Sequence, residues 1–204
     1  MTASLTFDPV AVGRAECDSW AAYYRREWRR FLISALALVR ESFRLNRRQT
    51  VQGAWYMLRA NQAWAPFPDN DPDTARAQMR SFYALVNQAG RLRVDPARAA
   101  ELEVGWWHVH RQHQHDPAVS GEDLVTALVD LYAYTYDAEP AAVRHAAELR
   151  VEAMDHSDAW VSNGCSLADP LLAKERLALV ASYTALRGAI DSGRPMISAR
   201  ASRS

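Results

Sequence analysis

The sequence predicts an all-α, single-domain bundle of about seven helices, and three observations support this prediction. Apolar residues recur at steps of three and four along most of the chain, as they do on the buried face of a helix. Proline, glycine and aspartate interrupt this pattern at intervals that suit connections between helices. No segment shows the alternation of apolar and polar residues that is typical of a half-buried strand. We therefore expect one helical domain over residues 1–192.

The first three helices are separated by turn-forming residues. The first is expected over residues 9–45, where aromatic and aliphatic residues form one apolar stripe. The second is expected over residues 50–63 and ends at APFPDNDPD, because proline cannot sit inside a helix and Asp and Asn favour turns. The third is expected over residues 72–89 and ends at Gly90, a residue type that suits a helix C-terminus.

The remaining four helices are bounded by similar signals. The fourth is expected over residues 96–115, because Asp95 before a proline is a favourable start for a helix. The fifth, over residues 121–137, is apolar around most of its circumference, and we expect it to be the most buried. The sixth and seventh are expected over residues 139–162 and 167–190.

The composition agrees with a globular helical protein. Of the 204 residues, 49% are hydrophobic and 24% are charged, which is enough apolar material for a sizeable core. The formal net charge is zero, and no recognised nucleic-acid motif is present, so a whole-molecule nucleic-acid binder is not expected. A short C-terminal tail, residues 193–204, is expected to be disordered.

The sequence also predicts a cytoplasmic location. Cys17 and Cys165 lie far apart without a CxxC spacing, which suits a reducing compartment and indicates neither a zinc knuckle nor a disulfide framework. The most apolar run, FLISALALV, is far shorter than the roughly twenty residues of a transmembrane helix. The N-terminus shows no signal-peptide pattern.

One face of the first expected helix is rich in arginine. Residues 1–60 carry ten arginines and five acidic residues, a net charge of +5. The arginines of this face are Arg25, Arg26, Arg29, Arg40 and Arg44. They could bind phosphate or an anionic membrane surface, or they could be solvated or paired within the protein. A non-enzymatic interaction protein that uses this face is therefore one candidate function.

The fourth expected helix carries the strongest candidate site, in the stretch ELEVGWWHVHRQHQHD. On a helical wheel, Trp106 and Trp107 belong to the apolar arc. Glu103 and His110 are seven residues apart and lie in the middle of the same arc. An ionised carboxylate is costly to bury alone, so Glu103 must be paired, hydrogen-bonded, neutral or bound to a metal.

Two interpretations of this pair follow. The first is a structural polar network, in which arginines, tyrosines or backbone groups satisfy both side chains. The second is a site for a small molecule or a metal, with metal-dependent oxidoreductase chemistry as one form of it. For a small molecule, the expected ligand-binding residues are Tyr24, Glu103, Trp106, Trp107 and His110. Tyr24 joins the set because it lies at the centre of the apolar stripe of the first helix. Glu27, at the flank of that stripe, and Asp130 on the fifth helix are further expected partners of the pair.

For a metal, helical bundles use inward-facing Glu and His side chains from several helices. A Glu followed seven residues later by His resembles the ligand helix of the haem-oxygenase-like di-iron oxidases. This resemblance implies a transition metal such as iron and further ligands from other helices. On the sixth helix, Asp155 and Asp158 lie near the edges of the apolar face, so the expected metal ligands are Glu103, His110, Asp155 and Asp158. No histidine follows Asp158 at a helical step, which departs from the di-iron pattern.

Other stretches indicate no further chemistry. DNDPD superficially resembles a calcium-binding loop, but Thr74 and Arg80 occupy the positions where that loop needs glycine and glutamate, so a turn is expected. No glycine-rich phosphate loop, GxSxG or HExxH motif is present. The stretches GAWYMLRANQAWAPFPDNDPD, ELEVGWWHVHR and AMDHSDAW resemble a family of tryptophan-rich, all-helical proteins from GC-rich bacteria, a family that implies no activity.

Overall fold

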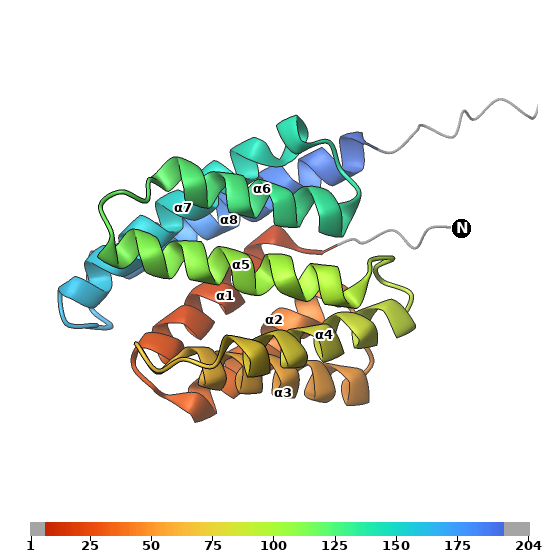
Figure 1. The fold of residues 1–204 in the computed structure, drawn as a ribbon, viewed down its shortest axis with the longest axis horizontal. Coiled ribbons are helices and arrows are strands. Elements are labelled where there is room, and N and C mark those ends of the chain that lie inside the picture. Colours follow the sequence, from red (N-terminus) through yellow and green to blue (C-terminus); the bar gives the residue numbers. More distant parts are fainter. Residues whose placement is uncertain (1–6, 194–204) are drawn as a thin grey trace, which may run out of the picture.

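The computed structural model describes residues 7–193, and these residues form eight α-helices and no strand (Figure 1). The helices are α1 (Pro9–Tyr24), α2 (Trp28–Phe43), α3 (Arg47–Trp64), α4 (Pro72–Gln88), α5 (Pro96–His115), α6 (Gly121–Tyr136), α7 (Pro140–Ser162) and α8 (Pro170–Ser192). The all-α prediction is confirmed. The predicted tail begins at Gly193, and its residues 194–204 lie outside the described part of the chain.

Most helix starts follow directly from the sequence. Helices α1, α4, α5, α7 and α8 each begin with a proline that comes directly after an acidic residue. Proline suits the first helical position because its missing N–H would have no partner there. The side chains of Asp8, Asp71, Asp95 and Asp169 each accept a hydrogen bond from a backbone N–H of the following turn. These caps satisfy donors that the helix itself leaves unpaired.

The prediction of one helix over residues 9–45 is wrong, because the chain turns between Tyr24 and Trp28. Arg26 adopts a left-handed backbone conformation with a φ of 58°. Its guanidinium donates a hydrogen bond of 2.7 Å to the carbonyl oxygen of Ala65, and it lies over the rings of Tyr23 and Trp28. No glycine or proline marks this turn. Tertiary contacts hold this turn, so periodicity alone could not show that the segment forms two helices, α1 and α2.

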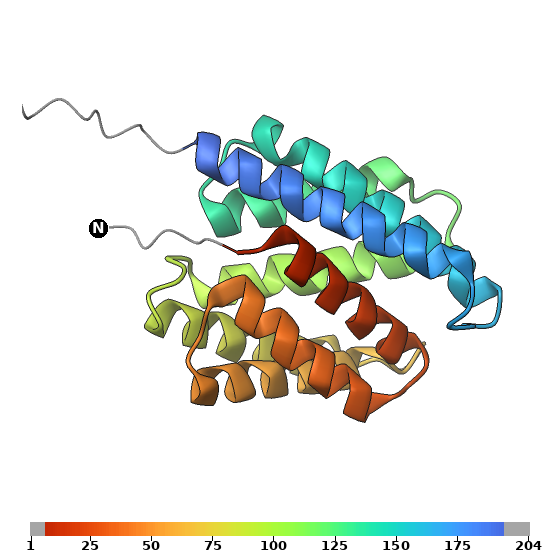
Figure 2. The same cartoon turned by 180° about the vertical axis from the view of Figure 1, so that it is seen from behind.

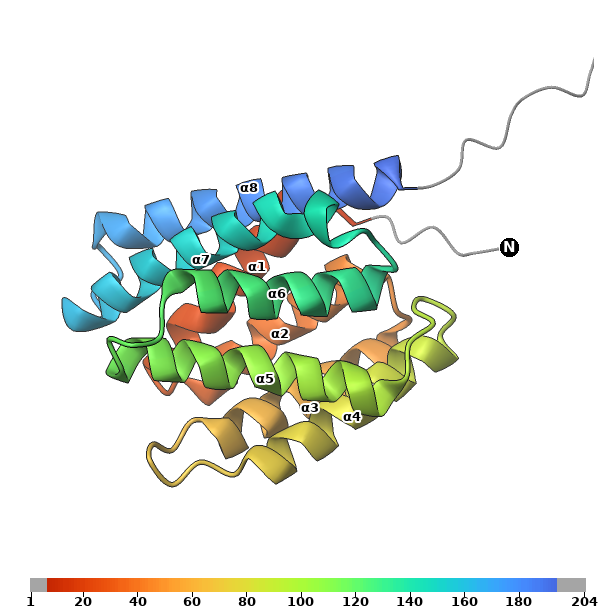
Figure 3. The ribbon, with the colours of Figure 1, turned by 45° about the horizontal axis from the view of Figure 1, so that its top comes forward.

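The eight helices form a closed ring. Each helix packs against the next along the chain, and α8 packs back against α1. Figure 2 shows α8, α1 and α2 side by side on one side of the molecule, and Figure 3 shows α8, α7, α6 and α5 in succession on another. Short connections between adjacent helices favour this arrangement. Each helix therefore turns one face toward a shared interior.

The packing of α1 is tighter than the sequence indicates. Seven of its sixteen residues are buried, against six of sixteen in α6, so the prediction that the helix over 121–137 is the most buried is wrong. At Gly13, a Cβ atom would lie 2.8 Å from the backbone nitrogen of Val180, so only glycine permits this approach of α1 to α8. Within residues 7–193, no helix combines the length and apolarity needed to cross a membrane.

Candidate functional site

Two neighbouring cavities lie inside the ring, and each has a volume of about 110 Å³. The tryptophan cavity is lined by α1, α2, α3, α5 and α7, and its tryptophans are Trp20, Trp64, Trp106 and Trp107. The tyrosine cavity is lined by side chains from all eight helices, and its tyrosines are Tyr83, Tyr132, Tyr136 and Tyr183. Both cavities share a wall that contains Glu16, Leu38, Met57, Glu103 and Arg150.

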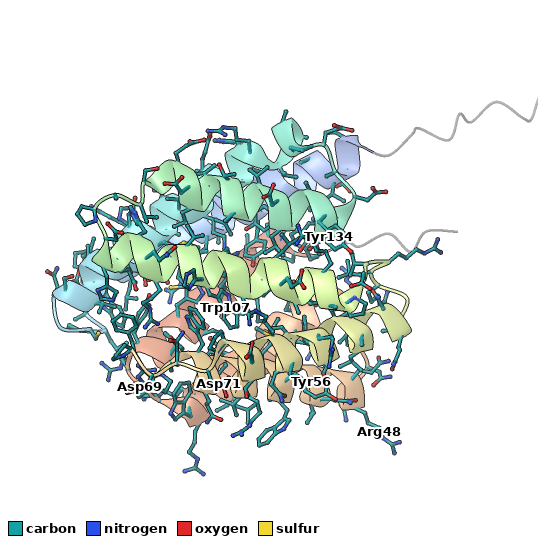
Figure 4. The ribbon with its side chains drawn as sticks, in the orientation of Figure 1. Arg48, Tyr56, Asp69, Asp71, Trp107 and Tyr134 are labelled. Carbon is teal, nitrogen blue, oxygen red and sulfur yellow. The ribbon has the colours of Figure 1, made fainter. Side chains whose placement is uncertain are left out.

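Two helices supply most of the tryptophan cavity, and each does so from a single face. On α1 the lining residues are Glu16, Ser19, Trp20, Tyr23 and Tyr24. On α5 they are Glu103, Trp106, Trp107, His110, Arg111 and Gln114. Both sets recur at steps of three and four, which brings them onto one side of a helix. Figure 4 shows Trp107 beneath α5, on the side that faces the helices α1 to α4.

Glu103 is hydrogen-bonded to neutral donors. Its Oε2 accepts a bond of 2.7 Å from the Tyr83 hydroxyl, and its Oε1 accepts one of 3.1 Å from the Trp106 indole nitrogen. Burial raises the pKa of the Glu103 carboxyl, although these two bonds and the nearby Arg150 guanidinium act in the opposite direction. Both oxygens of Glu103 are therefore engaged by the protein itself.

His110 belongs to a second polar group at the other end of the α5 face. Its Nε2 lies 3.1 Å from Oδ2 of Asp158 on α7. The Gln114 amide donates to Oδ1 of Asp158 at 2.6 Å and to the Tyr24 hydroxyl at 3.2 Å. The Tyr24 hydroxyl in turn lies 3.5 Å from Asp158. From α7, Asp158 thus contacts side chains of α1 and α5, although it lines neither cavity.

The shared wall contains an ion pair that our sequence reasoning missed. The Arg150 guanidinium binds both carboxylate oxygens of Glu16, through Nη1 and Nη2, and both side chains are buried. Nη1 also lies 3.2 Å from the hydroxyls of Tyr132 and Tyr183. The sequence contains a signal for a buried polar partner, because Glu16 and Trp20 are four residues apart and so lie on the same inward face of α1. A carboxylate on that face must be paired with a cation, hydrogen-bonded or neutral.

The predicted metal ligands are brought together only in part. His110 and Asp158 are in contact, Glu103 has partners elsewhere, and Asp155 is exposed and lines neither cavity. Among residues 7–193, no three His, Cys, Asp or Glu side chains form a group that could hold a metal ion. The metal site therefore stays a prediction that this geometry does not support.

Two other expected neighbours of Glu103 lie elsewhere. Glu27 pairs with Arg25 and Arg30 in and beside the turn between α1 and α2. Asp130 is exposed on α6 and lines neither cavity. Both expectations were wrong, and Tyr83 and Trp106 provide the hydrogen bonds instead.

The turn between α1 and α2 also divides the predicted arginine face. Arg25 pairs with Glu27 and donates to the carbonyl oxygen of Cys165, while Arg40 lies 3.6 Å from Glu41. Of the five arginines, Arg26, Arg29 and Arg44 have no carboxylate within 4 Å among the residues that the structure describes. The five side chains therefore do not form the single free surface that a continuous helix would present.

The chain matches no known family model, no curated protein and no solved structure. Its likeness to tryptophan-rich helical proteins and to di-iron oxidases therefore stays a prediction.

Proposed function

We propose that this protein binds a small organic molecule, about the size of one aromatic ring, in the tryptophan cavity. The observation that carries the proposal is a cavity of about 110 Å³ whose walls combine tryptophans and tyrosines with a few convergent polar groups. Ligand sites typically have this composition. The volume is of the same order as the roughly 150 Å³ engineered cavity that binds benzene.

The partners of Glu103 support an organic ligand more than a metal ion. A metal ligand must direct a carboxylate oxygen or a free nitrogen at the ion, and several such groups must converge. Here Tyr83 and Trp106 engage both oxygens of Glu103. The aromatic faces of Trp64, Trp106 and Trp107 offer the contact area that a planar molecule would use.

Binding can be tested with one-ring probes such as phenol and toluene. We expect each to raise the melting temperature of the protein and to change its tryptophan fluorescence. Trp107→Ala should weaken binding at least tenfold, because the indole forms part of the cavity wall. Trp55→Ala is the matched control, since Trp55 is 52% exposed on α3 and lies outside both cavities.

The same experiment distinguishes the alternatives. Treatment with a strong chelator should change neither the melting temperature nor probe binding. A loss of both after chelation, together with metal in the purified protein that Glu103→Ala or His110→Ala removes, would favour the metal site. If no one-ring probe binds and both tryptophan variants behave alike, the proposed function is wrong.

We also propose a second candidate function, the docking of an acidic amphipathic helix in a surface groove between α2 and α3. The groove has a volume of about 570 Å³ and is lined by Leu32, Leu36, Arg47, Arg48, Val51, Gln52 and Trp55. Val51 and Trp55 are 60% and 52% exposed and lie one helical turn apart in the same groove, and a contiguous exposed apolar patch of this kind marks interaction sites. Figure 4 shows Arg48 projecting away from the helices at one end of this region.

Charge indicates what would cover this groove. Residues 28–68 contain seven arginines and one acidic residue, so a complementary partner is acidic. The terminal segments of the chain do not fit, because residues 1–6 carry no acid and residues 194–204 carry three arginines and no acid. The floor of this groove is concave and largely apolar, so it can receive apolar side chains of a partner helix, as other helix-binding grooves do. At about 1.5 Å per residue, the part of α3 from Arg47 to Trp55 is about 12 Å long, which matches roughly two turns of a partner helix.

A designed peptide of leucines at helical spacing and glutamates elsewhere provides the probe. We expect it to bind in a fluorescence anisotropy assay, and Arg47→Glu or Trp55→Ala should weaken binding about tenfold. Arg80→Glu, at an exposed arginine of α4, is the control. Equal binding of a lysine version of the peptide, or binding to anionic lipid vesicles in place of the peptide, would contradict this assignment.

A further inference from the structure

The Arg150 guanidinium leaves one of its edges without a partner. The residue is only 6% exposed, and its guanidinium carbon lies 5.5 and 5.2 Å from the ring centres of Trp20 and Trp106. Glu16 occupies the end formed by Nη1 and Nη2. Among residues 7–193, the buried Nε has no hydrogen-bond partner, and Nη2 has one partner for its two hydrogens.

This edge has the geometry of a second carboxylate site. A guanidinium carries five N–H donors, and Nε–H with the outer N–H of Nη2 forms a parallel pair that matches the two oxygens of a carboxylate. A buried donor without an acceptor is costly, and nearly all such groups in folded proteins have a partner. Because Arg150 lines both cavities, a molecule inside them is the natural source of that partner.

The other charges of the tryptophan cavity agree with an anion. Arg111 lines this cavity, donates a hydrogen bond to the Tyr23 hydroxyl and lies over the rings of Trp64 and Phe67. Among residues 7–193, no carboxylate lies within 4 Å of its guanidinium. A ligand with a negative charge would therefore find a second cation besides Arg150.

A cation would find no such partner. Both oxygens of Glu16 are bound by Arg150, and one also accepts a hydrogen bond of 2.5 Å from Tyr183. Both oxygens of Glu103 accept bonds within the protein, as described above. Glu16 and Glu103 are thus engaged, while one edge of the buried Arg150 guanidinium has no acceptor within the part of the chain that the structure describes.

We propose that the ligand of the tryptophan cavity is a small aromatic carboxylate, whose ring lies among the tryptophans and whose carboxylate binds the Nε and Nη2 edge of Arg150. This inference rests on the proposed function, since it names the class of molecule that the same cavity takes. Arg111 adds a second positive charge to the cavity that receives it.

Three probes of nearly equal size and shape test the charge of the ligand: benzoate, benzamide and benzamidine. Isothermal titration calorimetry should show that benzoate binds at least tenfold more tightly than neutral benzamide, and that cationic benzamidine binds more weakly than both. If benzamide or benzamidine binds as tightly as benzoate, the carboxylate assignment is overturned while the proposed function stands. If none of the three binds, both are overturned.

Two variants locate the interaction. Arg111→Gln should weaken benzoate binding at least fivefold and leave benzamide binding unchanged, because it removes a positive charge from the cavity wall. The variant should still fold, because Arg111 is only partly buried and, within residues 7–193, belongs to no buried ion pair. Arg150→Lys retains the charge but loses the paired N–H edge, so in folded protein it should weaken benzoate at least tenfold. Arg144→Gln is the control, since Arg144 lies on the same helix and pairs with Glu122 outside the cavities.

The position of the probe provides a measurement that does not depend on folding of the variants. A crystal structure of the wild-type protein with benzoate should place a carboxylate oxygen within hydrogen-bond distance of Nε of Arg150. A water molecule on Nε, with benzoate bound elsewhere, would overturn the proposal.

Discussion

Glu16 and Glu175 are two glutamates at the same depth in the bundle, yet their surroundings differ. They are 4% and 0% exposed, respectively. Glu16 has the Arg150 guanidinium as its partner. Neither oxygen of Glu175 has a hydrogen bond of normal geometry within residues 7–193, and burial raises the pKa of its carboxyl to about 8. Depth alone thus does not determine the charge of a buried acid, whereas an opposite charge in contact with it does.

Glu16 and Glu175 also lie in different parts of the protein interior. Glu16 faces both cavities, where its ion pair forms a polar wall. Glu175 lines neither cavity and lies near the buried Cys17 thiol and the Ser157 hydroxyl. A neutral Glu175 can pack among these groups as an uncharged side chain. The ion pair of Glu16 and Arg150 is therefore accessible to a ligand in the cavities, whereas Glu175 contributes only to packing.

The largest effect should come from breaking the ion pair. Arg150→Met leaves Glu16 buried without a cation, and we expect the free energy of unfolding to fall by about 3–5 kcal/mol. Urea denaturation measures this loss. The double variant Glu16→Gln with Arg150→Met should recover much of it, because both charges are then absent. A double variant as unstable as Arg150→Met alone would show that packing, rather than charge, dominates at this position.

Glu175 should make stability depend on pH. Its folded pKa of about 8 lies above the value of 4.5 for an unperturbed Glu, so the native state holds a proton that the unfolded state releases. Stability from this group is complete below about pH 4.5 and is lost as the pH rises toward 8. Between pH 6 and 8 the free energy of unfolding should fall by about 2 kcal/mol on account of this group.

Glu175→Gln isolates that contribution, because it retains the shape of the side chain without a titrating proton. Its stability should exceed that of the wild type increasingly from pH 6 to 8. Glu101→Gln, at an exposed position of α5, is the control and should leave the wild-type profile unchanged. Parallel pH profiles for the Glu175→Gln variant and the wild type would contradict a protonated Glu175.

Glu103 is intermediate between these two acids, since neutral donors hold it. Tyr83→Phe removes the shorter of its two hydrogen bonds and should lower the free energy of unfolding by about 1 kcal/mol. Because that bond lowers the pKa of the carboxyl, the pKa of Glu103 should rise further in this variant. Carboxyl ¹³C NMR titration measures the shift. An unchanged pKa would show that Tyr83 does not donate to Glu103 in solution.

Helix starts and the inward face of α5 could be predicted from the sequence. Local signals locate most helices, because an acidic residue followed by proline starts five of them and Gly90 ends α4 with a φ of 69°. The inward face of α5 follows from spacing, and the structure places Glu103, Trp106, Trp107 and His110 on the cavity wall. These features depend on residues that are close together in the chain.

The remaining features depend on residues far apart. The turn at Arg26 is held by Ala65, and the partner of Glu16 is 134 residues away. Helical spacing indicates that Glu16 faces inward, but it does not say which of the other seven helices supplies the cation. For the same reason, the sequence could suggest Asp130 and Glu27 as partners of Glu103 but could not identify Tyr83.

The smallest effect is expected where an acid is neither deeply buried nor opposite a permanent charge. Asp158 and His110 have side chains that are 26% and 13% exposed, and the Gln114 amide also donates to Asp158. Asp158→Asn retains a carbonyl oxygen for one of these donors, so the free energy of unfolding should fall by less than about 1 kcal/mol. Thermal and urea denaturation measure the change, with Glu101→Gln as the exposed control. A loss as large as that of Arg150→Met would mean that the contacts of Asp158 with His110 and Gln114 are as important for folding as the buried ion pair.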